Sequence, residues 1–183
     1  MKFSLNYKHI WLLAWVSITV FTNCASHQNL SGWSEDNRTR YNNVKNLCKY
    51  LSSREINAVS EDRLYQYIYM DYVLLDTVVE RKEERLQAFN GLIISFKHYV
   101  DSVGVKNLDA VPLSEKVHSE YYRIFTAQED ITWMIPYTFV YFKKDDPHMD
   151  LGALFFHPDS KKLTSWILIN NGGRYWFLTF NLL

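Results

Sequence analysis

The sequence predicts an α+β fold, in which N-terminal helices pack on a curved antiparallel β-meander at the C-terminal end. Two observations support this class. Apolar residues recur at spacings of three, four or seven across residues 60–103, which is the periodicity of a helix with one buried face. From Ile131 onward, short runs rich in aromatic and β-branched residues alternate with turns that contain Asp, Pro, Asn or Gly, as consecutive antiparallel strands do.

The first residues have the layout of an export signal. Residues 1–9 contain Lys2 and Lys8 and no acid, and a mostly apolar run follows from Ile10 to Phe21. A helix that spans a bilayer needs about 20 apolar residues, so this run is too short for a transmembrane helix. A basic start followed by a short apolar run favours a secretory signal. We therefore predict that residues 1–23 are a signal peptide.

The end of this segment, FTNC at residues 21–24, resembles the signal of bacterial lipoproteins. In that class the apolar run ends in Leu, a small residue, Gly or Ala, and then a Cys that is acylated and becomes the first mature residue. Here Phe21 stands in place of Leu, and Asn23 stands in place of Gly or Ala. The resemblance implies lipidation of Cys24. Acyl chains contribute about 0.8 kcal/mol per buried methylene, so several chains hold a soluble domain at a membrane.

Lipidation would place the protein in the cell envelope, anchored to a membrane and facing the periplasm or the cell surface. The polar residues 24–36 would be a tether, and residues 37–183 would form a single α+β domain. The alternative is a secreted protein with an ordinary thiol at Cys24. In that case Cys24 could form a disulfide with Cys48, whereas an acylated Cys24 leaves Cys48 without a partner.

The charge of the chain argues against nucleic acid as a partner. The sequence has 20 basic and 20 acidic residues, and loss of Lys2 and Lys8 with the signal peptide leaves 18 basic residues against 20 acidic ones. A near-neutral domain lacks the basic surface by which nucleic-acid-binding proteins are recognised. Aromatic residues make up 16% of the chain, which favours a folded domain over disorder.

The domain is predicted to begin with a short helix over residues 34–53. Ser34 is its expected N-cap, and Glu35 and Asp36 lie in the first turn, where the helix dipole favours acids. Cys48 lies on the apolar stripe of this helix. We interpret it as a small buried side chain, since a reactive thiol needs an exposed and electropositive site.

A long helix is predicted over residues 60–103, with Gly104 just after its end. Forty-four residues is long for a globular helix, so a break is expected at 80–85 or at 90–91. The charged run at 80–85 is interpreted as a solvent-exposed face. Residues 65–73 are assigned to this helix, although their aromatic content would also suit a strand.

The second half is predicted to hold the sheet. Residues 105–112 are expected to be a connector, and 114–125 fit either a short helix or a strand. The predicted strands are 131–144, 151–157, 163–169 and 175–183, with turns at 144–149, 158–161 and 170–173. Phe155 and Phe156 point to opposite faces of a strand, so both faces of the sheet are apolar. One face should pack on the long helix. The other should enclose a pocket, meet a further helix or bind a partner.

The order of these elements is similar to the cone-shaped NTF2-like architecture. The similarity covers residues 84–183 and depends on helices before a curved sheet and on the closing Gly-Arg-Tyr-Trp-Phe at 173–177. That family uses its cone as a pocket for catalysis or binding, which implies a pocket under the sheet here. No catalytic residue of the family is matched in this chain.

No catalytic motif is found in the sequence, which has no G-x-S-x-G, no H-E-x-x-H, no phosphate-binding glycine loop and no paired-Cys metal site. The stretch DDPHMD at 145–150 has carboxylates and an imidazole that could hold a cation, but Asp and Pro are also turn residues, and we interpret it as a polar turn. Aromatic side chains could line a pocket or form core. The candidate pocket residues are Tyr137, Tyr141, Trp166, Tyr175 and Trp176, with Tyr67, Tyr69, Tyr72 and Trp133 as further aromatic candidates.

These observations predict a lipid-anchored cell-envelope protein with a non-enzymatic binding or structural role and no cofactor or metal. The alternative is an envelope enzyme or a small-ligand-binding protein that uses a pocket under the curved sheet. The membrane is the expected partner, through the lipid on Cys24. A protein partner or a small ligand at the second face of the sheet is the further expectation.

Overall fold

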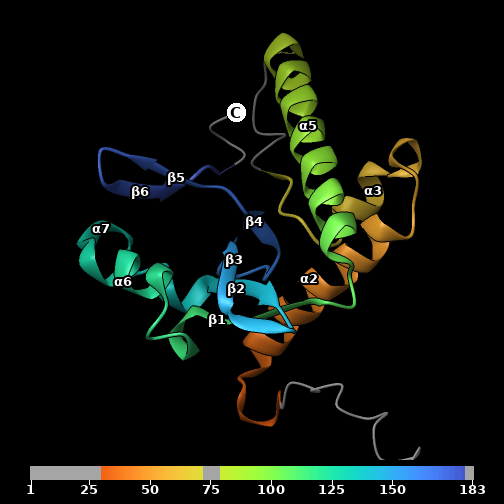
Figure 1. The fold of residues 1–183 in the computed structure, drawn as a ribbon. Helices are drawn as coiled ribbons and strands as arrows, with labels where there is room; N and C mark the ends of the chain where they lie inside the picture. Colours follow the sequence, from red (N-terminus) through yellow and green to blue (C-terminus); the bar gives the residue numbers. More distant parts are fainter. Residues whose placement is uncertain (1–29, 72–78, 180–183) are drawn as a thin grey trace, which may run out of the picture. The chain divides into compact units, whose positions relative to one another are not determined.

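The fold was obtained as a computed structural model, which describes residues 30–71 and 79–179 (Figure 1). The chain divides into two compact units, residues 1–32 and 33–183. The described part of the first unit is a short 3-10 turn, η2, at Leu30–Gly32. The predicted signal peptide, Cys24 and Tyr72 lie outside the described residues. In the second unit helices precede an antiparallel sheet, so the predicted α+β class is confirmed.

The first helix of the second unit, α2, spans Glu35–Ser52 and agrees with the prediction. The Ser34 hydroxyl accepts a hydrogen bond from the backbone N–H of Asn37 at 3.2 Å, so the expected N-cap is confirmed. The buried face of the helix includes Leu47, Cys48 and Leu51. Burial of Cys48, a free cysteine, is therefore also confirmed.

The single long helix predicted over 60–103 is wrong in its first part. Helix α3 covers only Glu61–Leu64, whereas α5, Val79–Val103, runs without interruption through both expected break points. Between them Ile68 forms a parallel bridge with Leu163, as a strand residue would. The helix ends there because the backbone of Tyr67 and Tyr69 bonds to Leu163 at the sheet edge, which a continued helix would leave open.

The main sheet has four strands in the order β1-β2-β3-β4, each antiparallel to its neighbour. Their bounds are Leu108–Pro112 for β1, Thr138–Lys143 for β2, Asp146–Phe156 for β3 and Leu163–Ser165 for β4. The antiparallel meander is confirmed for β2, β3 and β4. The predicted connector at 105–112 is wrong, because β1 lies there and pairs with β2 along its full length.

The last two strands, β5 at Leu168–Asn171 and β6 at Arg174–Phe177, form a separate two-stranded sheet. The predicted strand over 163–169 is thus split between two sheets. The tight turn is confirmed, since Gly172 and Gly173 have positive φ values of 62° and 86°, as a two-residue hairpin turn requires.

Two further expectations need correction, and the choice left open for 114–125 is decided in favour of helix. Residues 131–137 are not strand but belong to the short helix α7, Glu129–Thr132, and the 3-10 turn η5, Ile135–Tyr137. Pro136 fits there, because its fixed φ suits the first turn of a helix and its missing N–H removes no ladder bond. The segment 114–125 is helical, with the 3-10 turn η4 at Leu113–Glu115 and helix α6 at Glu120–Ala127. The predicted turn over 144–149 is only two residues long, since β3 already begins at Asp146.

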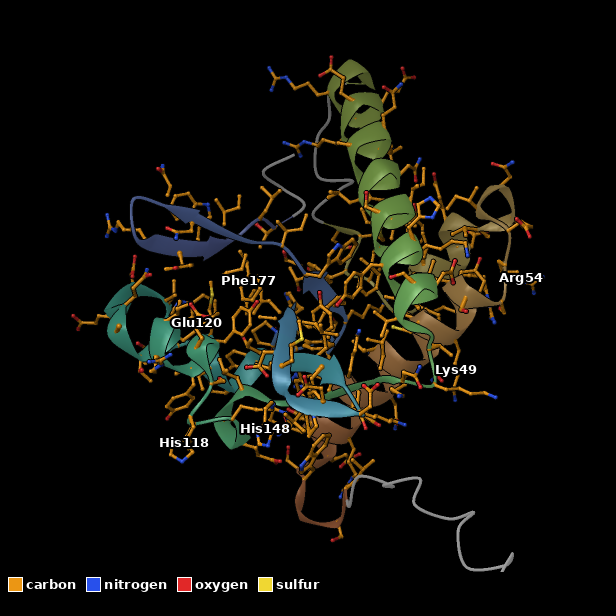
Figure 2. All side chains as sticks on the ribbon, in the orientation of Figure 1. Lys49, Arg54, His118, Glu120, His148 and Phe177 are labelled. Carbon is orange, nitrogen blue, oxygen red and sulfur yellow. The ribbon has the colours of Figure 1, made fainter. Side chains whose placement is uncertain are left out.

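Both faces of the main sheet are covered by this chain. On one face Tyr141 of β2 and Leu154 of β3 lie against Cys48 of α2 and Phe96 of α5. On the other face strand residues join side chains from η4, α6, α7 and β6 in one buried cluster, here called the second-face cluster: Leu113, Phe125, Ile131, Val140, Ala153, Phe155 and Phe177. Figure 2 labels Phe177, which β6 contributes to this cluster. The second apolar face is therefore met by helices and a hairpin of the same chain.

Candidate functional site

A polar network is buried where α2 crosses β1. The Asp109 carboxylate is only 6% exposed. Its Oδ1 accepts hydrogen bonds from the Tyr41 hydroxyl at 2.8 Å and from the backbone N–H of Ala110 at 3.0 Å. The ammonium of Lys45 lies 4.0 Å from the same oxygen and donates to the Leu108 carbonyl at 2.8 Å. Tyr41 and Lys45 are one helical turn apart, so they face β1 together.

Burial shifts the pKa values of Tyr41 and Lys45 in this network. Desolvation raises the pKa of Tyr41, and its hydrogen bond to Asp109 raises it further, so the phenol keeps its proton. Desolvation lowers the pKa of Lys45, and the nearby Asp109 charge opposes that shift. The hydrogen bonds and the ion pair described above reach Asp109 from α2 and from its own strand. The arrangement therefore joins β1 to α2, and we assign it a structural role.

A small cavity lies beside this network, between α2, α5 and the sheet. Its volume is about 20 Å³, which is room for about one water molecule. Its walls are mostly apolar and include Cys48, Phe96, Tyr99, Tyr141 and Leu154. A cavity of this size does not accommodate an organic ligand, since ligand pockets measure about 300–1,000 Å³.

The thiol and the phenol groups on the cavity wall are held in their neutral forms. Burial raises the pKa of the Cys48 thiol from 9.0 to about 12, so it is not a thiolate at neutral pH. Burial also raises the pKa of Tyr141. The Tyr99 ring meets Tyr141 edge-on at 5.9 Å, and the buried Tyr99 hydroxyl has no hydrogen-bond partner within the described residues. Among the described residues, the cavity wall therefore carries one buried hydroxyl group without a hydrogen-bond partner, that of Tyr99, but no activated nucleophile.

The candidate pocket residues lie in different parts of the core. Among them, Tyr141 lines the small cavity. Tyr137 and Tyr175 pack against the second-face cluster, and the guanidinium of Arg40 lies 5.4 Å from the centre of the Tyr137 ring. Trp166 stacks on Phe96 with ring centres 4.9 Å apart.

Trp176 does not share a hairpin face with Tyr175. It follows Tyr175 on β6, so its half-buried side chain is on the opposite face of the hairpin. Among the further candidates, Tyr69 stacks on His157 at 4.0 Å, and Trp133 is 53% exposed with its ring edge-on to Phe155. The spacing of these aromatic residues in the sequence could not show that their side chains lie apart. The face that each one occupies depends on where β6 begins and on how the hairpin packs.

The side chains of the acidic stretch at 145–150 do not converge on one site. Most of it lies on β3, whose successive side chains point to opposite sides. The Asp150 carboxylate accepts a hydrogen bond from Lys116 Nζ at 2.9 Å, and the same ammonium donates to the Pro147 carbonyl at 2.6 Å. Within residues 30–71 and 79–179 no three His, Cys, Asp or Glu side chains are placed to hold a metal ion.

Lys116 thereby forms one side of an open surface groove of about 300 Å³. The groove runs between the loop after η4 and the start of β3. His118 lines it from the loop and His148 lines it from β3, and both are labelled in Figure 2. Glu115 and Asp150 add negative charge beside Lys116. The sequence carries no signal for this groove, because its two sides are about thirty residues apart in the chain.

Comparisons with known proteins assign no family to this chain. No protein-family model matches it, and neither the curated proteins nor the solved structures include a significant match. The resemblances to lipoprotein signals and to NTF2-like folds therefore stay predictions. Of the helices in the described residues, none is both long and apolar enough to cross a membrane.

Proposed function

We propose that this chain is a lipid-anchored cell-envelope protein whose domain acts through its surface, in a binding or structural role and without catalysis. The observation that carries the proposal is the apolar run 10–21, which is followed three residues later by Cys24. Acylation at that position would tie the tether, and with it the folded domain, to a membrane. In this proposal the signal peptide is 1–23, and the domain faces the periplasm or the cell surface.

The interior of the domain supports a role at its surface. The buried carboxylate of Asp109 is bound to groups of α2 and β1, and the cavity beside it has the volume of about one water molecule. Both faces of the main sheet are covered by side chains of this chain. A site for substrate turnover would need a larger pocket with converging polar groups.

The surface offers two features suited to contact with another molecule. The groove between His118 and His148 carries both signs of charge, which suits a polar partner. Trp133 and Met149 are large apolar side chains that are 53% and 56% exposed. Trp and Met are enriched in protein–protein interfaces relative to other surfaces.

A second candidate function is the binding of a small ligand by the domain. The observation that favours it is the unpartnered Tyr99 hydroxyl on the wall of a mostly apolar cavity. A ligand would have to enlarge that cavity by displacing Tyr141. Replacement of Tyr99 by Phe would then weaken ligand-dependent stabilisation, measured as the shift in melting temperature with each compound tested.

The first proposal is tested by the change Cys24→Ala. We expect the wild-type chain to be found in the membrane fraction with the intact mass of a cleaved and acylated protein. The variant should be released from the membrane or should keep its signal peptide, because no thiol accepts the lipid. Cys48→Ala is the matched control. It removes a buried thiol, and the variant should stay with the membrane. Normal processing and unchanged membrane association of the Cys24 variant would contradict lipid anchoring.

A further inference from the structure

Three strand edges of the domain are closed by the chain itself. Residues 67–69 cover β4, where Leu163 N donates to the Tyr67 carbonyl and Tyr69 N donates to the Leu163 carbonyl, both at 2.8 Å. On β1, Lys45 and the Asp109 side chain bind edge groups of Leu108 and Ala110. A row of unpaired backbone groups would otherwise be a template for another strand.

The third closed edge is that of β6, and a side chain closes it. The Gln128 carboxamide donates to the Tyr175 carbonyl at 3.2 Å and accepts from the Tyr175 N–H at 2.8 Å. It binds the strand much as a neighbouring strand would. Figure 1 shows the β5–β6 hairpin beside α6 and α7, the two helices that Gln128 joins.

The outer edge of β5 has no such cover in the described part of the chain. Leu178 N donates to the Ile167 carbonyl at 2.9 Å, and the hairpin pairs Ile169 with Trp176. Since bonded and non-bonded pairs alternate in an antiparallel ladder, the backbone groups of Leu168 and Asn170 point away from β6. No hydrogen bond to these outward groups is recorded among the described residues. Tyr175, opposite Asn170, also points outward, which agrees with its bonds to Gln128.

The residues of β5 do nothing to block a further strand. The sequence Leu-Ile-Asn-Asn at 168–171 has no Lys, no Pro and no other charge, which are the usual means of protecting an edge. Among the described residues this sheet has two strands, and Gln128 and Phe177 hold it on the β6 side. A further strand at the β5 edge would supply the hydrogen bonds that this edge lacks.

We propose that β5 pairs with β5 of a second copy of this chain, antiparallel and about a two-fold axis at Ile169. In this register Leu168 lies opposite Asn170 of the second copy, and each such pair exchanges the outward N–H···O=C bonds that neither copy can make alone. The hairpins would then form one continuous sheet in the order β6-β5-β5-β6. The contact is isologous, so it closes a dimer and leaves no β5 edge for further growth.

The side chains favour a second copy over an unrelated peptide. Ile169 would face its own counterpart in a non-bonded pair, where side chains approach most closely and β-branched residues pack well. Trp176 lies beside Ile169 on β6, so the two copies would share an apolar stripe across the axis. The strand carries no charge that would oppose its copy, and the nearby Arg174 already lies 3.7 Å from Asp130.

The first test is the mass of the full-length chain in nonionic detergent, by sedimentation equilibrium. The wild type should have the mass of two chains. Ile169→Lys places like charges opposite each other at the axis and should give the mass of one chain. Ile94→Lys is the matched control: Ile94 is 40% exposed on α5, far from β5 in sequence, and this variant should remain a dimer.

The second test fixes the register and does not depend on a disruptive substitution. Ile169→Cys places thiols opposite each other at the axis, at the short Cβ separation of a non-bonded pair, and mild oxidation should give a cross-linked dimer. Asn171→Cys, on the same strand, would lie opposite Ile167 of the second copy and should not cross-link to itself. The wild type, with its native Cys24 and Cys48, sets the background.

Amide exchange separates dissociation from misfolding. Leu168 and Asn170 should exchange slowly in the wild type and quickly in Ile169→Lys, while the Tyr175 amide stays protected by Gln128 in both. A wild-type mass of one chain would overturn the proposal. So would a dimer that Ile169→Lys leaves intact and Ile169→Cys does not cross-link, or a monomer that accepts a strand from a different protein at this edge.

Discussion

At the scale of single residues, Gly152 of β3 is required by its neighbour Tyr141 on β2, to which it is paired in the sheet. A Cβ atom at position 152 would lie 2.5 Å from both Cε1 and Oη of Tyr141. The aromatic ring thus lies across the glycine backbone, a cross-strand arrangement known to support glycine in sheets. This contact directs Tyr141 toward the small cavity.

We expect Gly152→Ala to lower the free energy of unfolding by about 1–3 kcal/mol, because the added methyl group must displace the Tyr141 ring. Gly91→Ala in α5 is the control, since apart from its chain neighbours and the helix's own backbone nothing lies within 4 Å of the Cβ position. There the same substitution should stabilise the protein by about 0.5–1 kcal/mol, as Ala favours a helix interior over Gly. Urea unfolding of both variants measures the difference, and equal effects would refute the packing argument.

The buried thiol of Cys48 should make stability depend on pH. Burial raises its pKa in the folded state from 9.0 to about 12, so on raising the pH the unfolded chain loses this proton first. The contribution of the thiol is therefore complete below pH 9 and is lost progressively between pH 9 and 12. Tyr41 and Tyr141 act in the same direction, since burial raises their pKa values as well.

Urea unfolding below and above pH 9 should thus show a falling free energy of unfolding. Cys48→Ala should reduce the steepness of that fall, whatever it does to stability at neutral pH. The slope is the quantity to compare, because the loss of a buried side chain changes the absolute value. Identical slopes in the two proteins would show that the thiol does not remain protonated by burial.

At the scale of elements, Gln128 connects the junction of α6 and α7 to β6. We expect Gln128→Ala to speed amide exchange at Tyr175 and to cost about 1 kcal/mol of stability, the usual net value of a lost hydrogen bond. Gln128→Glu keeps an acceptor for the Tyr175 N–H but has no donor for its carbonyl. Its Tyr175 amide should therefore stay more protected than in the Ala variant. Unchanged exchange in Gln128→Ala would mean that packing alone, through Phe177 and its neighbours, positions the hairpin.

At the scale of the whole folded unit, α5 supplies buried side chains over only part of its length. Phe89 is fully buried, whereas Glu83 in the preceding charged run is exposed. Phe89→Asp should abolish cooperative folding. Loss of a buried Phe costs about 3–5 kcal/mol and an unpaired buried carboxylate adds several more, against a total stability of about 5–15 kcal/mol.

Glu83→Lys is the control for this prediction and should change stability by less than about 0.5 kcal/mol. Thermal melts of the two variants make the comparison. Similar melting temperatures would contradict the orientation of α5. Leu75, one of the apolar residues that recur at helical spacing across residues 60–103, lies outside the described residues.

Some features of the folded unit could be predicted because neighbouring residues decide them. The Ser34 cap depends on a hydroxyl three residues before an N–H, and the turn at Gly172 and Gly173 depends on positive φ. The burial of Cys48 followed from its place on a helical stripe. Whether the five candidate pocket residues lie together could not be predicted, because they share only their aromatic character and no spacing in the sequence. Their separation depends on which face of a strand or hairpin each one occupies.

The α+β class, the capped first helix and the tight last turn could be read from the sequence, since they follow from periodicity and local backbone preference. The proposal of export and lipidation depends on the sequence alone, through residues 10–24. Three features appear only in the folded chain: residues 67–69 bond to β4, β5 and β6 form a sheet of their own, and Tyr41 bonds Asp109 across 68 positions of chain. Such contacts depend on hydrogen-bond partners and apolar surfaces brought together by folding, and no local pattern records which distant segment will supply them.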